Sequence, residues 1–290
     1  MNYNWVYPDS AKYYAGGKQA VEYYNGQITS RRRDYLLPFV DGEQRYEEEV
    51  AQLNENGFVI FKQAIEHDIL DRILQKTNKI IEERKYLKIH DEHYSMIADP
   101  FIHVPEAQEI AFSDHLVGVA SEYFKCIPAI GTFNLRRSYV NNSPPKSTQL
   151  FHYDRNSIKF FKFFMYLNDV DNIEDGPLTL IKESNKKRLS NHVYQHRWSE
   201  GDMKQTYGDD SLIYLTAKKG DLIAATTTCY HRGTKPVTKE RTMLTLNYVI
   251  HQELEGGQPS SPTSQFKIKQ EQYDSLPDWK KPVADFLVKV

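Results

Sequence analysis

The sequence has few cysteines, little net charge and no long apolar run, and each of these absences excludes a class of protein. Two cysteines, Cys126 and Cys229, are too few for a disulfide framework or a zinc cluster, and each is expected to pack as a small buried hydrophobe. A formal net charge of −2 disfavours nucleic acid and anionic membranes as partners. No apolar run approaches the roughly 18 residues that a membrane-spanning helix needs.

Several functional motifs are also absent. The chain contains no glycine-rich phosphate loop, no serine nucleophile elbow and no paired-cysteine zinc motif. Residues 1–5 do not begin a charged segment followed by an apolar one, as a secretion signal would. We therefore expect a soluble, cytoplasmic protein. No pattern in the sequence indicates its oligomeric state.

The chain is long enough for a full domain and is rich in aromatic side chains. Its 290 residues are 40% hydrophobic and 13% aromatic, which is enough to bury a full core, and an all-β barrel of this size can form one domain. Apolar residues recur at helical spacing in three segments, 46–56, 66–85 and 105–124. Alternating or apolar runs bounded by turn residues predict strands at 57–61, 132–140, 149–154, 160–167, 177–181, 212–215, 222–230 and 242–250.

The order of these elements predicts the fold. Helices followed by about eight short strands indicate a mainly β protein, a double-sheet jelly roll with N-terminal helices packed against it. A last short helix is expected at 279–288, and the polar segment 182–211 is the expected loop over a site. We expect a single domain over 1–290, with an N-terminal arm at 1–45, a helical buttress at 46–129, the jelly-roll core at 130–252 and a tail at 253–290.

A histidine and an aspartate two residues apart mark the candidate metal site. His152 and Asp154 lie in the segment Gln149-Leu150-Phe151-His152-Tyr153-Asp154, and on an extended segment residues at this spacing point to the same side. Both side chains can then bind one metal ion. Such a pair is common by chance in a chain with ten histidines, so the order and spacing of the residues that follow decide its interpretation.

The candidate third ligand is His231, which ends a later strand-like run in Cys229-Tyr230-His231-Arg232-Gly233. Two histidines and a carboxylate form the facial triad of non-haem Fe(II) oxygenases, which leaves three metal positions for a chelating cosubstrate and dioxygen. A closed structural zinc site would instead use four protein ligands, usually with cysteine. The run His90-Asp91-Glu92-His93 is consecutive rather than on one face, and it predicts a solvated loop.

Arg241 begins the next strand-like run, and a hairpin between 231 and 241 would bring it back beside His231. A 2-oxoacid that chelates iron through its keto-acid end needs its far carboxylate held, and the planar guanidinium binds a carboxylate bidentately. The alternative interpretation is a surface arginine paired with Glu240.

Four more residues are candidates for the pocket. Gln149 would face away from His152 on a regular strand, unless a bulge or a turn intervenes between them. Asn134, Arg136 and Tyr139 lie on a strand that is expected to neighbour the metal-binding segment. Any of the three is a candidate to contact the cosubstrate or the substrate, and each is also compatible with a purely structural role.

Over about residues 50–250 the chain resembles the phytanoyl-CoA dioxygenase (PhyH-like) family of Fe(II)/2-oxoglutarate-dependent oxygenases. The resemblance depends first on His152-x-Asp154 and His231-Arg232-Gly233, which match the three iron ligands. Arg241 matches the residue that anchors the far carboxylate, and Gln149 matches a glutamine that contacts the cosubstrate. The family's opening strand and helix are similar to Gly57-Phe58-Val59-Ile60 and the helix that follows it. The family's Asn-Gly strand start is similar to Asp175-Gly176-Pro177-Leu178. The resemblance implies a double-stranded β-helix, a cupin-like jelly roll.

The chain departs from the family pattern at two places. Lys182-Glu183-Ser184-Asn185 stands where Pro-Gly-Ser-His is usual, so the substrate class is not inherited. The spacing from His231 to Arg241 is one residue shorter than the commonest pattern, and a one-residue change on a strand reverses the face of a side chain. Asp154 is retained, whereas halogenating members replace this carboxylate with a small residue.

The sequence therefore predicts an Fe(II)- and 2-oxoglutarate-dependent dioxygenase that oxidises an unactivated C–H bond of a small molecule, most simply by hydroxylation, and releases succinate and CO2. Iron, 2-oxoglutarate and O2 are the expected cofactor and cosubstrates. Desaturation, epoxidation and ring closure are alternative outcomes. Three other interpretations remain open: a cupin-type metalloenzyme without 2-oxoglutarate, a non-catalytic jelly-roll binding module, and an oxygenase of the same class that acts on protein or nucleic acid.

Overall fold

The structure is a computed structural model, and it describes residues 22, 25–26, 28–31, 46–154, 159–189, 196–250, 254–255, 258–259 and 266–290. Most of the expected N-terminal arm, 1–45, lies outside the described residues. Within the described residues, no helix combines the length and the apolar character that crossing a membrane requires.

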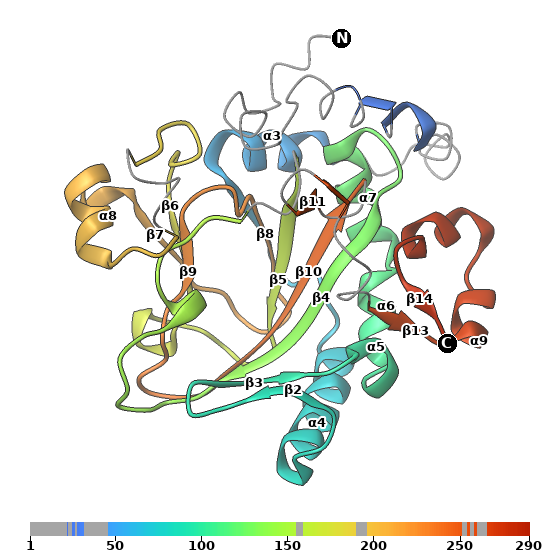
Figure 1. Ribbon diagram of the computed structural model, residues 1–290, viewed down its shortest axis with the longest axis horizontal. Coiled ribbons are helices and arrows are strands. Elements are labelled where there is room, and N and C mark those ends of the chain that lie inside the picture. Colours follow the sequence, from blue (N-terminus) through green and yellow to red (C-terminus); the bar gives the residue numbers. More distant parts are fainter. Residues whose placement is uncertain are drawn as a thin grey trace.

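Two antiparallel β-sheets form the centre of the molecule (Figure 1). The larger sheet has seven strands in the order β1-β8-β5-β10-β4-β3-β2, and the smaller has three in the order β7-β6-β9. Their bounds are β1 Phe58–Phe61, β2 Leu87–His90, β3 Tyr94–Ile97, β4 Ala129–Ser138, β5 Phe161–Tyr166, β6 Leu178–Ile181, β7 Leu212–Leu215, β8 Leu222–Ala225, β9 His231–Gly233 and β10 Arg241–Val249. This is the mainly β, double-sheet architecture that the sequence predicts.

Helices cover the face of the larger sheet that points away from the smaller one (Figure 1). They are α3 Glu47–Asn56, α4 His67–Glu83, α5 Pro100–His103, α6 Glu106–Ala111 and α7 Asp114–Phe124. The single helix expected at 105–124 is wrong, because Ser113 interrupts it. The Ser113 hydroxyl accepts a hydrogen bond from Leu116 N at 3.3 Å, which caps the start of α7 and lets the chain turn between the two helices.

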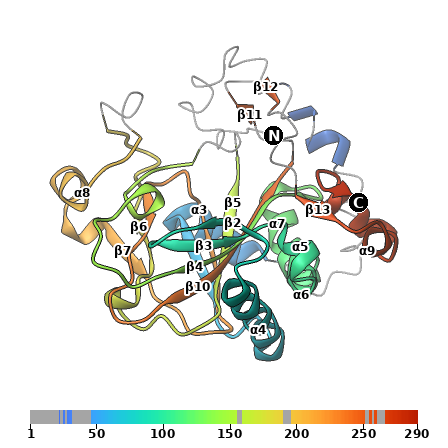
Figure 2. The same ribbon diagram turned by 60° about the horizontal axis from the view of Figure 1, so that its bottom comes forward.

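The segment 182–211 is not the irregular loop that its polar composition suggests. It contains the helix α8, Glu200–Tyr207, beside β6 and β7 and at the end of the molecule away from α9, Gln270–Asp274 (Figures 1 and 2). A capping box starts α8: Ser199 Oγ accepts from Asp202 N at 3.2 Å, and the Asp202 carboxylate accepts from Ser199 N at 2.8 Å. This Ser-x-x-Asp spacing is a readable start signal.

Two further expectations are corrected. The expected solvated loop at His90–His93 is the turn of the β2–β3 hairpin, and His93 is only 2% exposed. The expected last helix at 279–288 is replaced by a 3₁₀ helix, Asp278–Ala284, and the strand β14, Val288–Lys289, which pairs with β13, Lys267–Ile268. In the tail, the short strands β11, Leu254–Glu255, and β12, Gln258–Pro259, pair with each other.

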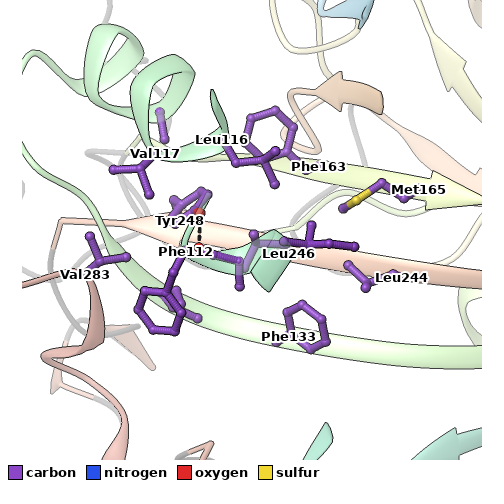
Figure 3. Close-up of a cluster of buried hydrophobic side chains, with 14 of the residues drawn as sticks. Phe112, Leu116, Val117, Phe133, Phe163, Met165, Leu244, Leu246, Tyr248 and Val283 are labelled. Atoms are coloured by element: carbon purple, nitrogen blue, oxygen red, sulfur yellow. Dashed lines mark hydrogen bonds between the residues drawn. The ribbon is translucent and has the colours of Figure 1, made fainter. Parts of the chain in front are cut away.

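The main core lies between the larger sheet and the helices (Figure 3). Along β10, Leu244 and Leu246 turn their side chains towards the helices, while Arg241, Met243 and Thr245 line a cavity on the other face. This alternation follows from the period of two in a strand. Because both faces of β10 are covered, its residues are buried almost without a break.

We expect Leu246→Ala to destabilise the fold by about 2–5 kcal/mol, the usual loss when a buried leucine is truncated in a packed core. Leu246 is fully buried in this cluster and has no contact with the cavity face, so ligand affinities should stay near wild type. Urea unfolding followed by circular dichroism measures the change. A loss below about 1 kcal/mol would show that the core is less tightly packed at this position than the structure indicates.

Candidate metal centre

His152, Asp154 and His231 form one cluster, with a ligand atom from each within 4.8 Å of the others. The distance from Asp154 Oδ1 to His152 Nε2 is 3.9 Å, and from Asp154 Oδ2 to His231 Nε2 it is 3.5 Å. The two histidines are 6% and 5% exposed. Among the described residues this is the one group of at least three histidine, cysteine or acidic side chains close enough to hold a metal ion.

Backbone pairing between distant segments creates this cluster. His152 N donates to His231 O at 2.9 Å, and His231 N donates to His152 O at 2.7 Å, so the two residues form an isolated antiparallel bridge. Asp154 N donates to Thr227 O at 2.9 Å. The expected strand 149–154 is therefore a bridged extended segment rather than a regular strand, but it keeps His152 and Asp154 on the same side.

Backbone carbonyls fix the orientation of both imidazole rings. His152 Nδ1 lies 3.0 Å from Leu150 O, and His231 Nδ1 lies 3.0 Å from Cys229 O. A carbonyl only accepts, so each Nδ1 carries the proton and each Nε2 presents a lone pair to the cluster. This is how second partners usually orient metal-binding histidines.

The protonation states also suit a metal ligand set. Burial lowers the pKa of His152 to about 3, with a further contribution from neighbouring His231, and burial likewise lowers the pKa of His231. Both imidazoles are thus neutral near pH 7, as metal binding requires. Burial alone would raise the pKa of the Asp154 carboxyl, but the ammonium of Lys162 together with His231 and His152 outweighs this and keeps the pKa well below its usual range.

A cavity of about 190 Å³ opens beside the cluster, between the two sheets. Of the candidate pocket residues, Asn134, Arg136 and Gln149 line it. Tyr139 does not: its hydroxyl lies 2.6 Å from Ser95 Oγ, on the side of the β2–β3 hairpin. Asn134, Arg136 and Ser138 of β4 line the cavity, and Tyr139 follows them with the opposite parity.

Gln149 reaches the cavity because the chain turns just before the metal-binding segment. A 3₁₀ turn over Ser147–Gln149 precedes Leu150, so the strict alternation of a strand does not apply between Gln149 and His152. The Gln149 side chain is 7% exposed, and its Oε1 accepts from Lys146 N at 3.2 Å. Cys229 is fully buried and packs in the core, as expected.

Arg241 lies deep in the same cavity and is 2% exposed. Its Nη1 donates to Gly176 O and, at 3.4 Å, to Thr234 O, and its Nη2 donates to Ser138 Oγ at 3.1 Å. Its buried Nε has no hydrogen-bond partner among the described residues. Burial lowers the pKa of Arg241 to about 10, so the guanidinium remains charged at neutral pH.

The alternative interpretation of Arg241, a surface residue paired with Glu240, does not agree with this geometry. Glu240 instead approaches Arg137, with 3.9 Å between its Oε2 and Arg137 Nε. Gly233 leaves room for Arg241, because a Cβ at this position would lie 3.2 Å from Arg241 Nη2. A buried cation with an unpaired donor, next to the cluster of His152, Asp154 and His231, is a suitable receptor for a carboxylate.

No protein-family profile and no curated protein match the chain at a significant level. Solved structures do match it. The α-ketoglutarate-dependent carbocyclase SnoK from nogalamycin biosynthesis is 13% identical, with a TM-score of 0.57, and the match covers 77% of this chain and 95% of SnoK. EctD from S. alaskensis with bound Fe is also 13% identical, with a TM-score of 0.59 and coverage of 83% and 86%. HygX from Streptomyces hygroscopicus, with nickel and 2-oxoglutarate, is 12% identical, with a TM-score of 0.55 and coverage of 76% and 90%.

The fold is a double-stranded β-helix. At these identities the likeness concerns the fold, which confirms the predicted architecture, whereas the narrower resemblance to the phytanoyl-CoA dioxygenase family stays a prediction. Within the double-stranded β-helix, β9 of the smaller sheet carries His231, and the larger sheet carries Arg241. The cluster and the arginine therefore lie where the two sheets face each other across the cavity.

Lys162 on β5 is a site residue that sequence reasoning missed. Its ammonium lies 2.6 Å from Asp154 Oδ2, and its side chain is 15% exposed. A readable signal existed, because Lys162 is the one charged residue in the apolar run 160–167. A buried charge in such a strand needs a partner, and only the folded chain shows that the partner is Asp154.

We expect Lys162→Met to destabilise the metal-free protein and to tighten metal binding by about tenfold, which corresponds to about 1.4 kcal/mol. Without the ammonium, the Asp154 carboxylate is buried without its partner in the free protein, and it is fully available to a divalent cation. Ni(II) titration calorimetry and the metal-induced shift in Tm measure both effects. Weaker Ni(II) binding in this variant would show instead that Lys162 holds Asp154 in its binding geometry.

Proposed function

We propose that the protein is an Fe(II)- and 2-oxoglutarate-dependent oxygenase that oxidises an unactivated C–H bond of a small molecule, most simply by hydroxylation. One observation carries the proposal: two neutral histidines and a carboxylate share a cavity with Arg241, a buried cation whose Nε lacks a partner among the described residues. The histidines and the carboxylate are the donor set of Fe(II) oxygenases. The arginine is the complement of a dicarboxylate cosubstrate.

In this proposal His152, Asp154 and His231 hold the iron, and Arg241 binds the far carboxylate of 2-oxoglutarate. With iron, 2-oxoglutarate and O2 bound, the centre supplies the oxidising power that breaks the C–H bond. The chain's own contribution is to bind and to orient. Gln149 lies on the wall beside His152, and the apolar side chains of Phe164, Leu178 and Met243 limit the access of water.

The structural neighbours support the class of reaction but not its outcome. HygX carries nickel and 2-oxoglutarate in its solved structure, EctD carries iron, and SnoK is described as a carbocyclase. One fold can serve more than one reaction, and the reaction depends on the residues that the fold carries. Hydroxylation is proposed as the simplest outcome. A single domain over 1–290 and a cytoplasmic location are retained as parts of the proposal.

The test is an anaerobic titration of the Fe(II)-loaded protein with 2-oxoglutarate. We expect a weak visible metal-to-ligand charge-transfer band that saturates, followed in air by the formation of succinate. Succinate itself, which lacks the keto group, is the control and should give no band. If Fe(II) binds and no band appears with 2-oxoglutarate, the proposed function is wrong and a cupin-type metalloenzyme explains the site better. If no metal binds, the binding-module interpretation is favoured.

A further inference from the structure

The cavity contains more positive than negative charge. Arg136, Lys162 and Arg241 line it, and the only carboxylate among its described lining residues is Asp154. Lys162 pairs with Asp154, so the two arginines have no acidic partner within the cavity. Arg241 is buried and Arg136 is partly buried. Removing a cation from water without a counter-charge is costly, so the two arginines indicate that ligands supply the missing negative charge.

The side chains that Arg136 contacts directly are polar or aromatic but uncharged. Its Nη1 donates to Thr148 Oγ1 at 2.8 Å, and its guanidinium lies 4.3 Å from the centre of the Tyr94 ring. Among the described residues it forms no ion pair. The acidic group that influences it electrostatically, Asp91, forms its own ion pair with Lys146 at 3.1 Å. The guanidinium is therefore fixed in position and keeps donors for a further acceptor.

The proposed cosubstrate does not neutralise the cavity. A divalent metal and three cationic side chains face one aspartate and the two carboxylates of 2-oxoglutarate, which leaves two positive charges unmatched. This charge balance favours a second anionic ligand in the site. This step rests on the proposed function, because it counts both the metal and the cosubstrate.

Arg241 and Arg136 occupy different places on the cavity wall. Arg241 starts β10, opposite Ser138, and its bonds run to backbone oxygens of Gly176 and Thr234. Arg136 lies one strand further, on β4, and its contacts run to Thr148 and to Tyr94 on β3. The two guanidiniums are thus held by separate sets of partners, which favours two receptors over a single shared one.

We propose that Arg136 is the receptor for a carboxylate on the substrate, so that the substrate of this enzyme is a carboxylic acid. Stacking on Tyr94 fixes the plane of the guanidinium and leaves its edge free to bind a carboxylate through two parallel hydrogen bonds. The carboxylate orients the substrate, and the C–H bond to be oxidised lies elsewhere on the same molecule, towards the metal cluster.

The test compares matched acids and amides on the protein loaded with Ni(II) and 2-oxoglutarate, which does not turn over. The probes are acetate with acetamide, and benzoate with benzamide, titrated by calorimetry up to 100 mM, with methyl phosphate as a different anion. We expect saturable binding of the acids, with the amides at least about tenfold weaker, since the amides lose a charge-assisted hydrogen bond to the guanidinium. Equal binding of acid and amide, no acid binding, or a preference for methyl phosphate overturns the proposal.

Variants locate the binding. Arg136→Met should abolish the preference for the acid, and Arg136→Lys should restore part of it. Arg137→Met is the matched control, because Arg137 lies on the opposite face of β4 and bonds to Asn78 and Thr242. Acid binding that survives in Arg136→Met is binding to the metal and contradicts the proposal. Each variant is first shown to be folded by its unfolding transition.

The affinity for 2-oxoglutarate separates this inference from the proposed function. Arg136→Met should change the dissociation constant of 2-oxoglutarate by less than threefold. If it raises this constant as strongly as Arg241→Met does, Arg136 belongs to the cosubstrate anchor and the inference fails while the proposed function stands. If wild type never binds 2-oxoglutarate, the proposed function fails, and the acid–amide comparison on the Ni(II) protein still tests Arg136 alone.

Discussion

Replacing His152 with alanine should lower the affinity for Fe(II) or Ni(II) by at least about 100-fold, more than the 10–100-fold typical for the loss of a supporting partner in the outer shell of a metal site. His152 supplies one of three ligand atoms, and its ring is already oriented by Leu150 O and neutral at pH 7. Its loss leaves two ligands. We therefore also expect no charge-transfer band with 2-oxoglutarate and no formation of succinate.

Calorimetry with Ni(II) measures the loss of affinity, and the matched control is His103→Ala. His103 lies in α5 and stacks on Tyr86 at 3.9 Å between ring centres, away from the cavity. This control should bind metal like wild type. If His152→Ala binds Ni(II) with undiminished affinity while remaining folded, the cluster is not the metal site, and the proposed function loses its basis.

The sequence placed His152 and Asp154 together because the information for this pair is local. A two-residue step on an extended segment places His152 and Asp154 on one side whether or not the segment is a regular strand. His231 was added from the order and spacing of the strand-like runs that follow this pair, and from the resemblance of His231-Arg232-Gly233 to the third iron ligand. The structure confirms that the three residues meet, through the bridge between His152 and His231.

Other features depend on pairing between distant segments and could not be predicted. Lys162 meets Asp154 only because β5 lies beside the segment that carries the aspartate. Gln149 faces the cavity because of a 3₁₀ turn, and its sequence has no strong signal for one. The helix α8 was missed for another reason: its capping box was readable, but the polar composition around it favoured a loop.

The alternation of side chains along the strands places one set of residues in the core and the other set in the cavity wall. On β4, β5 and β10 the residues of one parity pack against the helices, and those of the other parity, including Arg136, Lys162 and Arg241, face the smaller sheet. The core therefore fixes the positions of three cations at once. A site built on strands in this way is positioned more rigidly than one built on loops, which suits the orientation of a small ligand.

Replacing Arg241 with methionine should raise the dissociation constant of 2-oxoglutarate by at least about 30-fold, because removing one partner from a buried charge pair costs about 2–5 kcal/mol. Metal affinity should change little, since Arg241 is not one of the three ligands. The variant also loses its bonds to Gly176 O and Thr234 O. Some loss of stability is therefore expected, and it has to be separated from the loss of binding.

Pyruvate provides this separation. It carries the same keto-acid end as 2-oxoglutarate but has no far carboxylate, so its contacts with the metal are retained and its contact with Arg241 is absent. Wild type should bind pyruvate far more weakly than 2-oxoglutarate, and Arg241→Met should bind the two with nearly equal affinity. The four dissociation constants form a thermodynamic cycle whose coupling energy belongs to Arg241 and the far carboxylate. If Arg241→Met weakens both ligands by the same factor, that coupling is zero: the arginine then acts by supporting the cavity wall, and the cosubstrate anchor has to be sought at another cation.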